Sequence, residues 1–148
     1  MKIRDVLQLK DEKHRTAITI VPKETVLAAI HKLVEWDRGA LSVCDDAGRL
    51  LGIVTERDVV RKCLANGGSC ANITVDSIMT RKVAIGTLDD DTDYAINVMK
   101  EKLIRHIPIL DGERVVGMIS MRDLLGLELA ECKAQTRYVH ILPKGVHS

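Results

Sequence analysis

The sequence contains very few aromatic residues: they make up 2% of its 148 residues, and phenylalanine is absent. The core must therefore be built mainly from aliphatic side chains and methionine. The formal net charge of +1 gives no long-range attraction to nucleic acid or to an anionic membrane. No apolar run approaches the roughly 20 residues of a membrane-spanning helix, and the first residues lack the pattern of a signal peptide. We therefore expect a cytoplasmic protein without nucleic-acid or membrane partners.

The four cysteines also lack the spacing of a metal site. Cys44, Cys63, Cys70 and Cys132 form no CxxC pair and have no histidine at ligand spacing. We therefore expect no metal, and reduced thiols are the default in a cytosol. Cys44 lies in an apolar strand pattern and is expected in the core. Cys63 and Cys70 lie seven residues apart across a Gly-Gly turn, and we interpret them as a chance pair rather than a redox switch.

One seven-residue segment occurs twice. GIVTERD at 52–58 is matched class for class by GMISMRD at 117–123, which lies 65 residues later. Upstream, Ala29 aligns with Ala95 and Asp45 with Asp111, at a spacing of 66. The spacing therefore changes by one residue at a predicted hairpin turn, where a deletion is tolerated. A unit of about sixty residues is marginally stable alone, so we expect two repeats that share a core.

Each copy is predicted to form a strand, a helix, a two-strand hairpin and a second helix, after a short helical turn. The first helix begins near Pro22 and ends at Gly39 in a left-handed conformation. The predicted strands are 17–21, 40–44 and 49–54 in the first copy, and 82–85, 105–110 and 115–119 in the second. The buried stripe of the helix in the second copy is predicted to be Ala95, Ile96, Met99 and Leu103.

These elements predict an α/β (α+β) fold with a first repeat at 1–68 and a second at 69–130. The tail at 131–148 has no counterpart in the first copy. It is either an arm that packs on a second subunit or a free terminus.

Both copies of the motif place a hydroxyl three residues before a carboxylate: Thr55 before Asp58, and Ser120 before Asp123. A carboxylate can accept two hydrogen bonds from the vicinal diol of a ribose, and amides at a helix start point toward an anion. The alternative interpretation is helix capping by the aspartates, but the duplication favours ligand binding. Neither hydroxyl has a histidine partner in the sequence, so we expect no catalytic residues and no enzyme activity.

Two strand-helix-strand-strand-helix units that end in this motif resemble a tandem pair of cystathionine-β-synthase (CBS) domains, the Bateman module, of the bacterial stand-alone type. The resemblance covers residues 3–129. It implies two β-α-β-β-α repeats packed through their sheets about a pseudo-two-fold axis, with two clefts for adenosyl ligands. It also implies a homodimer whose signal passes to a separate effector protein.

The function implied is regulatory: signal transduction by adenine-nucleotide binding, with no required cofactor. AMP, ADP or ATP is favoured as the ligand over NAD(H) or S-adenosylmethionine. The alternative is a structural or protein-interaction module with vestigial clefts.

The resemblance also assigns residues to each cleft by their position in the motifs. First-cleft candidates are Thr16, Ala17, Ile18, Gly39, Ala40, Leu41, Thr55, Arg57 and Asp58. Second-cleft candidates are Lys82, Val83, Ala84, Arg105, His106, Ile107, Pro108, Ser120, Arg122 and Asp123. The copies differ where Gly39-Ala40 aligns with Arg105-His106. Arginine binds phosphate through two N–H groups and histidine can carry charge, so we expect the second cleft to bind more tightly.

Overall fold

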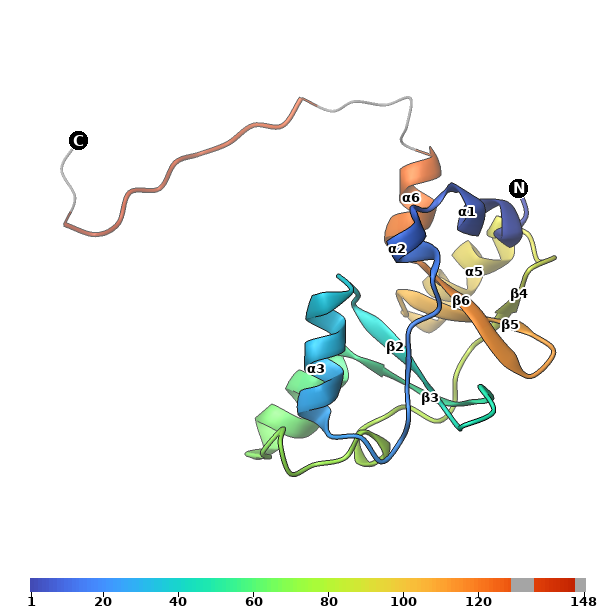
Figure 1. The fold of residues 1–148 in the computed structure, drawn as a ribbon. Helices are drawn as coiled ribbons and strands as arrows, with labels where there is room; N and C mark the ends of the chain where they lie inside the picture. Colours follow the sequence, from blue (N-terminus) through green and yellow to red (C-terminus); the bar gives the residue numbers. More distant parts are fainter. Residues whose placement is uncertain (129–134, 146–148) are drawn as a thin grey trace.

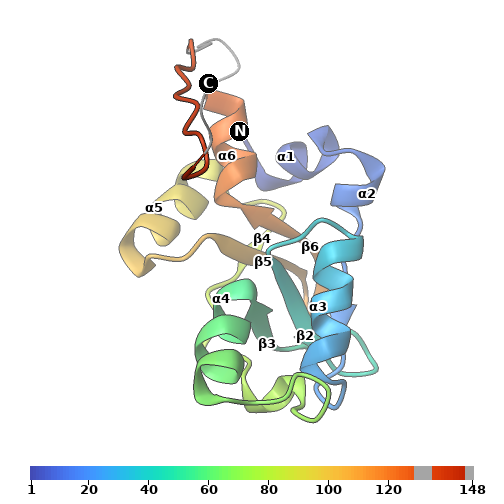
Figure 2. The ribbon, with the colours of Figure 1, turned by 90° about the vertical axis from the view of Figure 1, so that its left-hand side faces the viewer.

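The computed structural model describes residues 1–128 and 135–145. It contains two three-stranded sheets, ordered β1-β2-β3 and β4-β5-β6, each with its own helices (Figures 1 and 2). In both sheets the first pair of strands is parallel and the second is an antiparallel hairpin. The predicted α+β fold of two repeats is confirmed.

The first sheet consists of β1 (Thr19–Ile20), β2 (Ala40–Cys44) and β3 (Leu50–Thr55). Helix α3 (Val26–Glu35) is capped at its N-terminus by Thr25, whose hydroxyl accepts a hydrogen bond of 3.1 Å from the Ala28 amide. The helix buries Val26, Ala29 and Leu33 against the sheet. After β3 the chain continues through α4 (Glu56–Asp58), the π-helical turn η1 (Val59–Cys63) and the 3-10 turn η2 (Leu64–Asn66).

The second sheet consists of β4 (Gly86–Thr87), β5 (His106–Asp111) and β6 (Arg114–Ser120). Helices α5 (Thr92–Lys102) and α6 (Met121–Glu128) accompany it. The core on this sheet is aliphatic apart from Met99, and it includes Ile107, Ile109 and Ile119. The two repeats are therefore built alike, as the duplicated sequence predicted.

The short helical segment that leads into each repeat packs on the opposite repeat. Ile3, Val6 and Leu7 of α1 (Ile3–Leu9) join the core of the second sheet. In return, Val75 of η3 (Val75–Ser77), followed by Ile78 and Met79, joins the core of the first. Neither repeat therefore completes its core from its own residues alone.

This exchange explains the glycine that opens each copy of the motif. A Cβ on Gly52 would lie 2.8 Å from the Thr80 carbonyl oxygen and 2.9 Å from the Met79 sulfur. A Cβ on Gly117 would lie 3.1 Å from a methyl carbon of Leu7. At Gly52 only a residue without a side chain lets the exchanged segment approach the strand so closely, whereas at Gly117 a Cβ would require a small shift of Leu7.

The sheets meet through a small apolar cluster. It contains Ala40, Ile53 and Met118, with Val83 packed against it. Ile53 of β3 exchanges two backbone hydrogen bonds with Thr80, at 3.0 and 2.8 Å. The segment between the repeats therefore lies along the edge of the first sheet, which brings its next residues to the junction between the sheets.

Four local predictions were wrong. The strand predicted at 82–85 lies instead at Gly86–Thr87, and the strand at 17–21 is reduced to Thr19–Ile20. The left-handed residue after α3 is Asp37, with φ of 52°, rather than Gly39. Leu103 follows α5 with φ of 55° and is 84% exposed, so it is not part of the buried stripe. Both helices thus end in a left-handed residue at aligned positions.

The described part of the tail, residues 135–145, is exposed and extends away from the two repeats (Figure 1). Cys132 and the tail's first residues, 131–134, lie outside the described residues. The short helix α2 (Glu12–Arg15) connects α1 to the first sheet. Within the ranges that the structure describes, no helix has the length and apolar character needed to cross a bilayer.

Candidate functional site

Two clefts lie at the junction between the repeats, one at each copy of the duplicated motif. The Asp58 cleft has a volume of about 520 Å³ and is lined by residues of β3, α4, η1, the segment 80–84 and the start of β5. The Asp123 cleft has a volume of about 590 Å³ and is lined by residues 10–14, 37–40 and the motif of β6 and α6. Each cleft therefore draws on both repeats.

In the Asp58 cleft, one carboxylate oxygen is held by the motif itself. The Thr55 amide and hydroxyl donate to Asp58 Oδ2 at 3.0 and 3.1 Å, while the Asp58 amide donates to Thr55 Oγ1 at 3.1 Å. This is a reciprocal capping box. The capping interpretation of Asp58 is therefore confirmed. The capping box uses only one of the two carboxylate oxygens, Oδ2.

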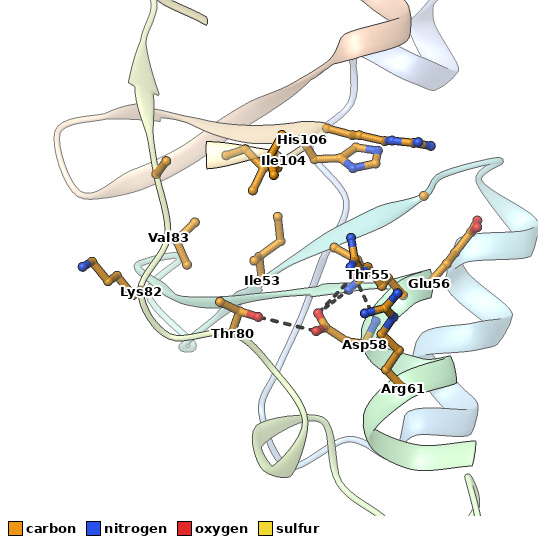
Figure 3. Close-up of a pocket in the computed structure, with 15 residues that line it drawn as sticks. Ile53, Thr55, Glu56, Asp58, Arg61, Thr80, Lys82, Val83, Ile104 and His106 are labelled. Carbon is orange, nitrogen blue, oxygen red and sulfur yellow. Dashed lines mark hydrogen bonds between the residues drawn. The ribbon is translucent and has the colours of Figure 1, made fainter. Parts of the chain in front are cut away.

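The second oxygen of Asp58 has polar contacts beyond the motif. Lys62 Nζ lies 3.0 Å from Asp58 Oδ1. The Thr80 hydroxyl donates to the same oxygen at 3.5 Å (Figure 3). Asp58 is 8% exposed, so its carboxylate is an oriented acceptor at the cleft wall rather than a mobile surface group. A carboxylate in this position can accept hydrogen bonds from a diol.

The other walls of the Asp58 cleft combine apolar and cationic groups. Ile53, Val83 and Ile104 line it from β3 and from the second repeat (Figure 3). Four basic side chains line it against two carboxylates, those of Glu56 and Asp58; the basic residues are Arg57, Arg61, Lys82 and Arg105. An apolar slot beside an oriented carboxylate and an excess of cations suits a flat base, a sugar and an anionic group.

The clefts group the candidate residues differently from the sequence-based assignment. Lys82, Val83, Ala84, Arg105 and His106 were placed with Asp123, but all five line the Asp58 cleft. The physical reason is the pairing of Thr80 with Ile53, which lays the start of the second repeat along the first sheet. The expectation of tighter binding at Asp123 rested on Arg105 and His106. Arg105 lines the Asp58 cleft, whereas His106 lines both clefts.

The Asp123 cleft is organised around an internal ion pair. Lys10 Nζ lies 3.0 Å from Asp123 Oδ2 and donates to the Met118 carbonyl oxygen at 3.1 Å. Both charged side chains are largely buried, at 13% and 18% exposure. The Ser120 amide also donates to Asp123 Oδ2 at 2.8 Å. The carboxylate that corresponds to Asp58 is therefore already bound by a lysine from the N-terminal segment.

The charge of the Asp123 cleft is also different. Three basic side chains line it, Lys10, Arg38 and Arg122, against four carboxylates. Those carboxylates belong to Asp11, Asp37, Glu56 and Asp123. An anionic ligand is consequently better matched by the Asp58 cleft.

His106 lines both clefts, together with Gly39 and Glu56. A Cβ on Gly39 would lie 3.0 Å from two ring atoms of His106, so the glycine at this position makes room for the imidazole. Burial lowers the pKa of His106 below its ordinary value, Asp123 opposes this, and Arg105 and Lys10 contribute to the lowering. The ring is therefore a neutral wall between the clefts near pH 7.

Some of the remaining candidates line a cleft, and the others do not. Gly39, Ala40, Ser120 and Arg122 line the Asp123 cleft, and Thr55 and Arg57 line the Asp58 cleft. Leu41, Ile107 and Pro108 are fully buried, and Thr16–Ile18 line neither cleft.

Sequence reasoning missed several residues that line the clefts. Ile53 lies in the motif and Arg61 lies one turn beyond it, so the motif could have indicated both residues. Thr80 and Lys10 reach the clefts only through the exchange of N-terminal segments between the repeats, for which the sequence carries no local signal.

With this geometry established, comparison with known proteins identifies the family. A family model described as the CBS domain matches residues 3–65 and 75–129. The chain belongs to the CBS domain family. The resemblance found in the duplicated motif is thereby confirmed across both repeats.

The similar proteins cover nearly the whole fold. A protein with CBS domains from Burkholderia ambifaria is 34% identical, with a TM-score of 0.83, and the match covers 93% of this chain and 100% of that chain. The CBS domain pair of protein MJ0100, solved with 5-methylthioadenosine and S-adenosyl-L-methionine, is 26% identical, with a TM-score of 0.77 over 88% of this chain and 98% of that chain. An uncharacterized protein of Methanopyrus kandleri is 30% identical over 77% of this chain, and the match spans 59% of that relative's length.

Proposed function

We propose that this CBS pair is a non-catalytic regulatory module that binds an adenine nucleotide in the Asp58 cleft. The observation that carries the proposal is the composition of that cleft. It combines the oriented carboxylate of Asp58, an apolar slot and four basic side chains, at the junction of two repeats. These groups match, in turn, a ribose, an adenine and a phosphate.

The charge of the cleft distinguishes among adenosyl ligands. Basic side chains outnumber carboxylates there by four to two, and arginine can bind phosphate through two N–H groups. We therefore favour AMP, ADP or ATP over S-adenosylmethionine, whose sulfonium is cationic, and over NAD(H), which is larger. The MJ0100 pair, which was solved with adenosyl ligands, supports the general ligand class.

A ligand in this cleft would act by shifting a conformational equilibrium. Asp58 belongs to the first repeat, whereas Lys82 and Arg105 belong to the second. A nucleotide that contacts all three favours the arrangement in which the repeats hold these groups together. We propose that this arrangement is transmitted through a homodimer to a separate effector protein, in the cytoplasm.

Titration calorimetry with AMP, ADP, ATP, NADH and S-adenosylmethionine tests the proposal. We expect at least one of the three phosphorylated adenosines to bind below millimolar concentration, and more tightly than S-adenosylmethionine does. Absence of any binding below millimolar would contradict the proposal and favour a protein-interaction module with vestigial clefts. Turnover of ATP under the same conditions would contradict the non-catalytic assignment.

A further inference from the structure

Two cysteine side chains, Cys63 at the end of η1 and Cys70 in the segment that follows it, meet at the core of the first sheet. The sulfur atoms of Cys63 and Cys70 are 3.7 Å apart. Cys63 is fully buried in the first core, and Cys70 is partly buried against the same core. Their separation of seven residues favoured a chance pair, but the fold places the two thiols in contact. They are therefore a candidate site for redox chemistry.

The loop between the cysteines is shaped to return onto Cys63. Gly67 ends η2 with φ of 73°, and the Gly68 amide donates to the Cys63 carbonyl oxygen at 2.9 Å. A Cβ on Gly68 would clash with the Ile73 side chain and would lie 3.3 Å from the Cys63 sulfur. The Gly-Gly turn is thus a requirement of the close approach of the loop to the thiol.

The backbone of Cys70 is held by α3. Its carbonyl oxygen accepts a hydrogen bond of 2.8 Å from the Leu27 amide, in the first turn of α3. Because both backbones are anchored, the thiols remain neighbours in the folded protein. A disulfide needs a sulfur separation of about 2.05 Å, so the sulfurs must close by roughly 1.7 Å.

We propose that Cys63 and Cys70 form a reversible intramolecular disulfide, with a low-molecular-weight disulfide of the glutathione class as the oxidant. The partly exposed Cys70 thiolate attacks the oxidant, which forms a mixed disulfide and releases one thiolate. Cys63 then loses its proton to solvent and attacks the Cys70 sulfur, which releases the second thiolate. Two protein thiols are oxidised and one small disulfide is reduced to two thiols.

The environment sets the order of these steps. Burial raises the pKa of the Cys63 thiol, and its hydrogen bond with Cys70 adds to this. Cys63 is therefore the poorer first nucleophile and the less accessible one. It acts as the resolving thiol once the oxidant has been captured by Cys70.

The disulfide would tie the segment that bears Asp58 to α3. One continuous helical segment carries Asp58, Arg61 and Lys62 and ends at Cys63. The Cys70 carbonyl oxygen is hydrogen-bonded to α3. The position that aligns with Cys63 in the second repeat is Glu128, so only the first repeat can be restrained in this way. The site does not depend on nucleotide binding, so it can be tested without a nucleotide.

Mass spectrometry of the full-length protein tests the bond directly. Both cysteines fall in one tryptic peptide, 63–81, between Lys62 and Arg81. After incubation with glutathione disulfide and alkylation of free thiols, we expect this peptide unalkylated and lighter than its reduced form by two hydrogen atoms. A peptide that stays fully alkylated, or that keeps a stable glutathione adduct on Cys70, would overturn the proposal.

Thermal unfolding tests whether the bond forms in the native fold. Closing a short loop is expected to raise the Tm of the oxidised protein by roughly 5 °C over the reduced protein. Cys70→Ser, at a partly exposed position, should abolish the difference, and Cys63→Ala provides a second variant. Cys132→Ser is the matched control and should retain it. A shift that survives in Cys70→Ser, or no shift in the wild-type protein, would contradict the assignment.

Discussion

The Asp58 and Asp123 clefts carry the same motif in the same local geometry, yet they present different chemistry. In both, an amide of the hydroxyl residue donates to the aspartate at 3.0 or 2.8 Å. Asp58 pairs with Lys62 of its own helical segment, in a cleft where basic side chains are in excess. Asp123 pairs with Lys10 of the N-terminal segment, in a cleft where carboxylates predominate. The motif therefore fixes the position of the carboxylate, and the segments from outside the motif decide what that carboxylate can bind.

The largest expected difference is in nucleotide affinity. Asp58→Ala should weaken AMP or ATP binding by about 10- to 100-fold, because a charged acceptor for the ribose is lost. Asp123→Ala should change it less than about threefold. Calorimetry on both variants, with Asp58→Asn to preserve side-chain size, measures the contrast. The sequence-based ranking predicts the opposite order, and observing that order would contradict our comparison.

The glycines of the motif should differ in their effect on stability. Gly52→Ala should lower the free energy of unfolding by about 1–3 kcal/mol, because its Cβ would meet the Thr80 backbone at 2.8 Å. Gly117→Ala should cost less than about 1 kcal/mol, since its nearest neighbour is the flexible end of Leu7. Urea unfolding of the two variants provides the measurement. Equal losses would show that the two exchanged segments are equally adaptable.

Removal of the lysine that pairs with Asp123 should expose the difference between the clefts. Lys10→Met should reduce the free energy of unfolding by about 1–2 kcal/mol, because a largely buried carboxylate loses its cation. Adding Asp123→Asn should restore part of that loss, and a double-mutant cycle in urea isolates the pair. If the two losses simply add, the ion pair does not stabilise the cleft.

The smallest effect is expected from the histidine between the clefts. Because burial lowers the pKa of His106 in the folded state below its ordinary 6.5, the unfolded chain binds the proton more readily. The stabilising contribution is therefore complete above pH 6.5 and is lost as the pH falls toward the folded-state pKa. His106→Gln should flatten the fall in Tm below about pH 6.5, whereas the exposed control His31→Gln should not. Identical profiles for wild type and His106→Gln would contradict this role.

The sequence predicted features that depend on local pattern. The duplicated motif located Thr55 with Asp58 and Ser120 with Asp123, and the hairpin strands emerged close to their predicted ranges. The spacing of 66 could also have related Asp37 to Leu103, which share a left-handed conformation after their helices. Gly39 was predicted instead because glycine is the residue most often found in this conformation after a helix.

The sequence could not predict which residues share a cleft. That assignment depends on α1 crossing to the second core and on Thr80 pairing with Ile53, contacts between residues far apart in the chain. Lys10 lies in a charged connector and looks like an ordinary solvated side chain. Its partner, Asp123, is 113 residues away, so no local periodicity links the two.

A crystal structure of the protein with AMP or ATP is the most direct test of the central claim. We predict a nucleotide in the Asp58 cleft, with its ribose hydroxyls bonded to Asp58, its base against Ile53 and Val83, and its phosphate beside the basic side chains. A nucleotide bound only in the Asp123 cleft, with Lys10 displaced from Asp123, would contradict the account.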